Sequence, residues 1–98
     1  MSALTPMSIV WRPRAADDFE RLIAASSESN TSHSSRDKSA VETKILQLVR
    51  FDQLGRKTRR IGVRELPVEG TPYVVVSRRR GSDILIMRIF HNGKATLS

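Results

Sequence analysis

The side chains best suited to chemistry or binding in this 98-residue chain are arginines in its second half. Four of them lie close together: Arg56, Arg59, Arg60 and Arg64. A guanidinium group presents a planar fork of donors that pairs with a carboxylate or a phosphate through two hydrogen bonds. The cluster therefore predicts a contact surface for an acidic polypeptide, for phosphates, or for both. A solvated basic loop is the alternative interpretation.

Further arginines follow in the run Arg78–Arg80 and at Arg88. The run falls at a predicted turn, where charge is readily solvated, so a binding role competes with a simple surface role. The predicted contact residues for a protein partner or target are Arg56, Arg59, Arg60, Arg64, Arg78 and Arg88.

Few side chains are candidates for proton transfer. His91 follows an apolar run, and its imidazole has an ordinary pKa near neutrality, as a general acid requires. Tyr73 begins another apolar run, where a packed tyrosine with a satisfied hydroxyl is the commoner role. Glu65 is the third candidate. A catalytic site built from these types would use His91 and Tyr73, with Arg64 stabilising negative charge; otherwise His91 and Tyr73 are structural.

The positive charge of the chain is unevenly distributed. Its formal net charge is +7. Residues 1–49 carry six basic and six acidic side chains, whereas residues 50–98 carry eleven basic and four acidic ones. A basic face attracts nucleic acid, an acidic protein surface or an anionic membrane, and it also keeps a protein in solution.

Composition excludes several classes of site. The chain has no cysteine and two histidines, so we expect no disulfide, no thiolate chemistry, no metal centre and no cofactor. No apolar run reaches the roughly 18–20 residues that span a membrane. The first ten residues lack the pattern of a secretion signal, so a cytoplasmic protein is predicted. The length predicts one domain with a thin core, which a bound partner would stabilise.

The first half of the chain predicts a strand followed by a helix. Residues 7–11 are largely apolar and β-branched, as in a short strand. Proline at position 13 suits the first turn of a helix over residues 13–25, with Asp17 and Asp18 near its positive end. One face of this helix is apolar, with the spacing of Ala15, Phe19, Leu22 and Ile23.

The next segment predicts a loop and a second helix. Residues 26–35 contain six serines and no large apolar side chain, which predicts a flexible loop. Val41, Ile45 and Leu48 then recur with helical spacing, so the second helix is expected over residues 37–51.

The second half predicts three strands with basic connections. Residues 56–60 read as a basic loop, and strands are expected over residues 61–68, 73–77 and 84–90. A basic turn is expected over residues 78–82. The predicted fold is of the α+β type, in the order β-α-α-β-β-β, with an antiparallel sheet covered on one face by a helical hairpin.

This order, and several local segments, resemble the ParE/RelE superfamily of toxins, and the ParE branch most closely. Residues 11–19 resemble the opening strand and helix start of ParE toxins, in which a proline and an alanine precede an acidic–apolar pair. A glycine–arginine pair at 55–56 and an arginine–x–leucine pattern in 63–66 follow at similar spacing. The start of the central strand in 72–75 and a final strand ending in histidine in 84–91 complete the resemblance over nearly the whole chain.

The resemblance implies the toxin component of a type II toxin–antitoxin system. ParE-like toxins inhibit DNA gyrase and replication and are neutralised by a ParD-like antitoxin, in a possible hetero-oligomer. RelE-like relatives are endoribonucleases that cut messenger RNA on the ribosome by promoting attack of the ribose 2′-hydroxyl. No tyrosine stands at position 77 or after His91, which favours a gyrase-binding inhibitor that is not an enzyme. A basic adaptor without toxicity is the third hypothesis.

The resemblance and the charge asymmetry together predict how an antitoxin binds. Its apolar side chains would lie in a groove on the helical hairpin, while its carboxylates would meet Arg56, Arg59 or Arg60.

Overall fold

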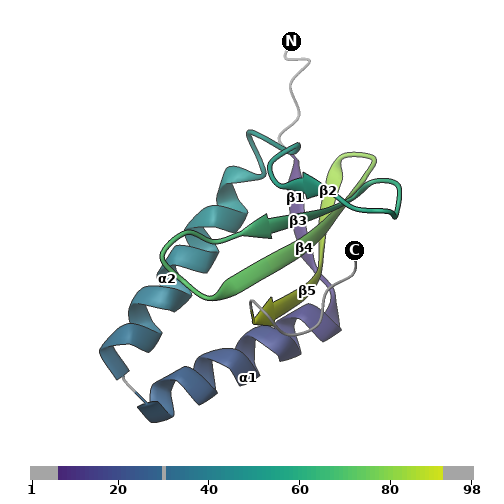
Figure 1. Cartoon of the computed structure of the whole chain (residues 1–98). Coiled ribbons are helices and arrows are strands. Elements are labelled where there is room, and N and C mark those ends of the chain that lie inside the picture. Colours follow the sequence, from purple (N-terminus) through teal and green to yellow (C-terminus); the bar gives the residue numbers. More distant parts are fainter. Residues whose placement is uncertain (1–6, 30, 92–98) are drawn as a thin grey trace.

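The computed structural model describes residues 7–29 and 31–91, which form an α+β fold (Figure 1). The elements are β1 (Ser8–Trp11), α1 (Pro13–Ser29), α2 (Thr31–Gln47), β2 (Arg56–Lys57), β3 (Val63–Pro67), β4 (Tyr73–Arg80) and β5 (Asp83–His91). The predicted order and the helical hairpin on one face of a sheet are confirmed, with the short strand β2 in addition.

The five strands lie in the order β1-β5-β4-β3-β2. The predicted antiparallel meander of β3, β4 and β5 is confirmed. The sheet is not antiparallel throughout, because β1 pairs in parallel with β5 from Ser8↔Asp83 to Trp11↔Ile86. β5 is mostly apolar, and its place between β1 and β4 pairs its backbone on both sides.

The basic segments contain more strand than predicted. Arg56–Lys57 pairs with β3, and β4 continues through Arg80 before a turn at positions 81–82. The predictions of a loop at 56–60 and a turn at 78–82 are therefore wrong over part of their length. Charged side chains are compatible with strand pairing where they face solvent at the end of a sheet.

The main core lies between the helical hairpin and the sheet. Ala15 of α1 and Val41 and Ile45 of α2 are buried against apolar residues of β3, β4 and β5, including Val75 and Ile86. The apolar spacing of the helices therefore identified the face that packs on the sheet. No helix within the described part of the chain is long and apolar enough to cross a membrane.

The serine-rich segment is helical, contrary to the prediction of a loop over residues 26–35. α1 extends to Ser29 and α2 begins at Thr31, while position 30 lies outside the described residues. The hydroxyl of Ser34, which is buried, donates a hydrogen bond to the carbonyl oxygen of Ile23 at 3.2 Å. Serine costs a helix only about 0.5 kcal/mol relative to alanine, so this tertiary contact outweighs its low propensity.

Gly55 marks the return of the chain from α2 to the sheet. Its φ is +98°, and a Cβ atom there would lie 2.7 Å from the carbonyl oxygen of Glu65. We expect Gly55→Ala to lower the free energy of unfolding by about 2–3 kcal/mol, from backbone strain and the displaced strand. Gly70→Ala is the matched control, since Gly70 has a φ of +81° and open space around it. Urea denaturation of both variants measures the difference, and equal losses would contradict a role for the close approach.

Candidate functional site

An apolar groove of about 700 Å³ lies between α1, α2 and β1. The stacked rings of Trp11 and Phe19, with centroids 5.5 Å apart, form part of its wall. Leu46 also lines it and is 65% exposed, so apolar surface faces solvent there. The lining residues are Ile9, Trp11, Ala16, Phe19, Glu20, Ile23, Lys38, Glu42, Ile45 and Leu46. Grooves of this kind receive apolar side chains of a partner polypeptide.

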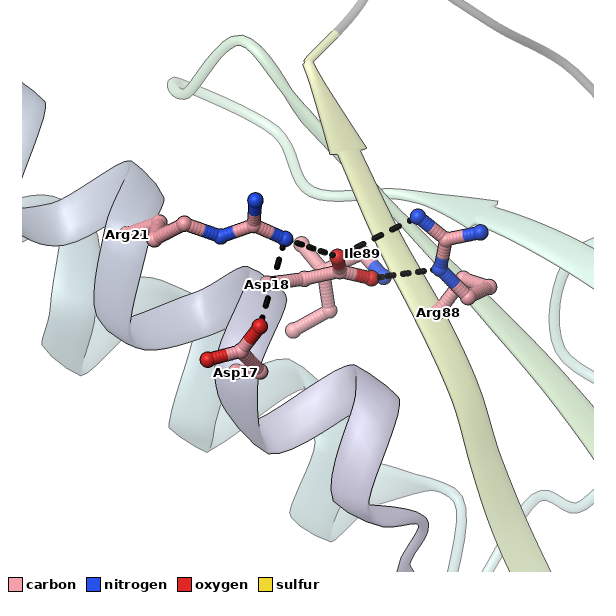
Figure 2. A network of polar contacts seen from close by, with 5 residues as sticks. All are labelled: Asp17, Asp18, Arg21, Arg88 and Ile89. Carbon is pink, nitrogen blue, oxygen red and sulfur yellow. Dashed lines mark hydrogen bonds and ion pairs between the residues drawn. The ribbon is translucent and has the colours of Figure 1, made fainter.

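A buried carboxylate joins α1 to β5 (Figure 2). Asp18 is 4% exposed, and its Oδ2 accepts hydrogen bonds from Arg88 Nε at 2.7 Å and from the Ile89 amide at 3.0 Å. Its Oδ1 accepts hydrogen bonds from Arg88 Nη2 at 3.2 Å and from Arg21 Nη2 at 3.3 Å. Arg21 also pairs with the exposed Asp17 at 3.4 Å. The contacts hold the first helix in one position on the final strand.

The surroundings of Asp18 favour its ionised form. Burial by itself raises the pKa of this carboxyl. The hydrogen bonds from Arg88 and the Ile89 amide, with the charges of Arg88 and Arg21, lower it, and their combined effect outweighs that of burial. The pKa of Asp18 therefore lies below its ordinary value. The hydrogen bonds between Arg88 and Asp18 raise the pKa of Arg88, so the two groups remain a charged pair.

Sequence reasoning missed this role of Asp18. α1 begins at Pro13, so Asp17 and Asp18 lie beyond its first turn, and the expected interaction with the helix end is wrong. Asp18 follows Ala15 by three positions and so falls on the buried face of the helix. The position of a carboxylate within an apolar stripe was the signal that could have revealed the buried role of Asp18. Nothing in the sequence pointed to Arg88, 70 positions away, as its partner.

Three of the six predicted contact arginines have partners inside the fold. Arg88 binds Asp18, and its guanidinium lies 4.8 Å from the centroid of the Phe90 ring. Arg56 pairs with the buried Glu65 at 3.4 Å. Arg64 donates to the carbonyl oxygen of Gly55 at 3.2 Å.

The other three predicted arginines face solvent. Arg59, Arg60 and Arg78 are exposed and have no carboxylate partner among the residues that the structure describes. Arg59 and Arg60 lie in the connection between β2 and β3, beside the end of β4 that carries Arg78. These three side chains are therefore accessible to solvent.

The structure brings together only two of the three residues named for a nuclease. Tyr73 and His91 are paired across β4 and β5, with ring centroids 6.0 Å apart. Arg64 pairs with Ser77, four positions along β4 from Tyr73, which corresponds to roughly 13 Å. The three side chains therefore do not converge on one point.

Tyr73 also lies in the core. It is 4% exposed, and its hydroxyl donates to the carbonyl oxygen of Leu22 at 3.5 Å. Burial raises the pKa of Tyr73 and the charge of Asp37 raises it further, against an opposing hydrogen bond with Ser26. A tyrosine in this setting retains its proton near neutral pH.

Comparison with known proteins identifies structures of similar fold and the family of this chain. No curated protein matches this chain. The chain is similar to a chain of the chromosomal ParDE toxin–antitoxin system from P. aeruginosa, with a TM-score of 0.78, 25% identity, and coverage of 88% of this chain and 96% of that one. It shares its fold with a chain of the toxin–antitoxin complex RelBE2 from Mycobacterium tuberculosis, with a TM-score of 0.66, 21% identity, and coverage of 90% and 100%. The model of the family described as the ParE toxin of the type II toxin–antitoxin system parDE matches residues 9–95, so the chain belongs to the ParE toxin family.

Proposed function

We propose that this ParE-family toxin inhibits DNA gyrase in the cytoplasm by binding, and that a cognate ParD-like antitoxin neutralises it. The observation that carries the proposal is the separation of Arg64 from Tyr73 and His91, together with the burial of Tyr73. A nuclease of the predicted kind needs its charge-stabilising arginine beside the proton-transfer groups, so that all of them reach one substrate phosphate. An inhibitor that acts by binding needs only a shaped and charged surface.

The antitoxin is proposed to bind the groove between α1, α2 and β1. Phe19, Ile23 and Leu46 offer apolar contacts there. The groove also contains Glu20, Lys38 and Glu42, which give it charges of both signs for orienting a peptide. The likeness to a chain of a ParDE system supports a partner of this type.

The arginines are proposed to contact the target or the acidic part of the antitoxin. Arg59, Arg60 and Arg78 are free to do so. Arg56 and Arg88 are paired with carboxylates inside the fold, whereas Arg64 binds a neutral carbonyl and still contributes positive potential to the surface.

Growth inhibition by variants tests the binding mechanism. We expect His91→Ala and Tyr73→Phe to keep most of the toxicity, because neither removes the exposed arginines. The double variant Arg59→Ala/Arg60→Ala should lose more of the toxicity. Circular dichroism of each variant checks that it folds.

The cellular response supplies a second measurement. A gyrase inhibitor should induce DNA-damage signalling and filamentous cells before translation falls, and purified toxin should inhibit gyrase supercoiling. A RelE-like nuclease would instead cut ribosome-bound messenger RNA, and loss of its general acid would slow cleavage by about 10²–10⁴-fold. Rapid cleavage of this kind that is lost in His91→Ala would overturn the proposal.

A further inference from the structure

Two turns at one end of the sheet form a single fixed structure. The β2–β3 connection and the β4–β5 turn lie side by side, on the side of the molecule away from the end of α1 and the start of α2 (Figure 1). The Arg79 amide donates to the carbonyl oxygen of Gly62 at 3.4 Å, which joins the β2–β3 connection to the end of β4 just before its turn. The Thr58 hydroxyl lies within hydrogen-bond distance of the carbonyl oxygens of Arg60, at 3.2 Å, and Val63, at 3.1 Å, and it accepts a hydrogen bond from the Arg60 amide at 3.1 Å, which closes the first turn.

This end of the sheet carries four exposed arginines: Arg59, Arg60, Arg78 and Arg80. None of the four has a carboxylate partner within the described residues, whereas the neighbouring Arg79 pairs with Asp52. Arg78 and Arg80 are two positions apart on β4 and so point to the same face of the sheet. Their charges add to those of the adjoining turn.

A large apolar side chain projects from the same turn. Ile61 is 94% exposed, directly between Arg60 and the glycine that precedes β3. A hollow of about 250 Å³ adjoins it and is lined partly by the polar or charged residues Lys57, Thr58 and Arg64. Protein-binding hot spots favour buried aromatic anchors in apolar surroundings. Proteins that bend DNA from the minor groove combine arginines or lysines with an apolar wedge, such as isoleucine, inserted between base pairs.

From this combination we infer that the end of the sheet formed by the β2–β3 and β4–β5 turns binds double-stranded DNA. The four arginines pair with backbone phosphates, and Ile61 enters a groove and contacts the bases. The fixed β turns suit this role, because two-stranded β-ribbons fit within DNA grooves. This inference goes beyond inhibition of gyrase, and it can be tested with DNA alone.

Fluorescence anisotropy of the 98-residue chain with a short labelled DNA duplex measures the interaction. Each phosphate contact contributes about −0.9 to the slope of log affinity against log salt, so four contacts predict a slope of roughly −3 to −4. Arg59→Gln combined with Arg60→Gln should make the slope shallower by about 2. Arg14→Gln combined with Arg36→Gln removes the same charge from exposed helix positions and should leave the slope unchanged.

Ile61→Ser tests the wedge separately from the charge. This variant should bind less tightly with the same salt slope, because no charge is lost. A duplex carrying 2-aminopurine should become more fluorescent when the wild-type chain unstacks its bases. Ile61→Ser should abolish that increase.

Several results would overturn the inference. One is the absence of binding to the duplex at low salt. Another is a salt slope that becomes as shallow in the Arg14→Gln/Arg36→Gln control as in the Arg59→Gln/Arg60→Gln variant. Equal or tighter binding to a matching RNA duplex would remove the assignment to DNA, because A-form grooves differ in width and depth. Unchanged DNA affinity in the Arg59/Arg60 variant, with weakened antitoxin binding, would assign this surface to the antitoxin. Gyrase inhibition is scored in a separate assay, so its failure would leave a positive DNA result intact.

Discussion

Asp18→Asn is expected to lower the free energy of unfolding by about 2–4 kcal/mol. Removing one partner of a buried ion pair costs about 3–5 kcal/mol, because the remaining charge is left uncompensated. The Arg88 side chain is 25% exposed, so water can partly solvate it in the variant and the cost is reduced. Urea denaturation followed by circular dichroism measures the change. A loss of this size is a large fraction of the total stability of a small domain.

Asp17→Asn is the matched control for this variant. The Asp17 side chain is 64% exposed, and its partner among the described residues is Arg21, which is 68% exposed. Surface pairs of this kind contribute about 0–1 kcal/mol. A double-mutant cycle of Asp18→Asn with Arg88→Gln should give a coupling energy within about 0.5–3 kcal/mol. Equal losses in the Asp17 and Asp18 variants would contradict the anchoring role.

The pH dependence of stability provides an independent check. The pKa of Asp18 is lower in the folded chain than its ordinary value, which is about 3.9. A carboxyl of this kind contributes its full stability above the unfolded pKa and loses it as pH falls towards the folded pKa. The advantage of the wild type over Asp18→Asn should therefore begin to narrow below about pH 4 and shrink further as the pH falls through the folded pKa. A gap that stays constant over this range would exclude this ion pair as the cause.

Leu46→Asp is expected to weaken antitoxin binding by at least about 30-fold, equivalent to about 2 kcal/mol, the level that defines a binding hot spot. Leu46 lines the groove between α1, α2 and β1 and is 65% exposed. An aspartate there can remain solvated in the free toxin, so folding is preserved. In the complex the charge would be buried against apolar side chains of the antitoxin, which is costly. Isothermal titration calorimetry with the cognate antitoxin measures the loss.

Phe51→Asp controls for nonspecific effects of a new charge. Phe51 is 59% exposed, follows the same helix and does not line the groove. This variant should bind the antitoxin almost as well as the wild type. Cells that carry the antitoxin should survive expression of the Phe51 variant but be poorly protected from the Leu46 variant. Equal affinities for the two variants would place the antitoxin elsewhere on the toxin.

The serine-rich segment shows where local interpretation of the sequence fails. Composition predicted a loop over residues 26–35, but Ser34 is buried against α1 in the helical hairpin. Helix propensities differ by only a few tenths of a kcal/mol per residue for most side chains. Packing between two helices is larger than that difference and is absent from the local pattern.

The sequence alone determined that two helices are present and which faces of them are apolar, most strand positions, the excess of positive charge in the second half and the resemblance to ParE toxins. Those features depend on residue spacing along the chain, which sets the face of each helix that is buried. Tertiary structure decided that β1 pairs in parallel with β5, that Asp18 binds Arg88, and that Arg64 lies apart from Tyr73 and His91. Each of these relations joins residues distant in sequence, so it exists only once the helical hairpin and the sheet have packed together.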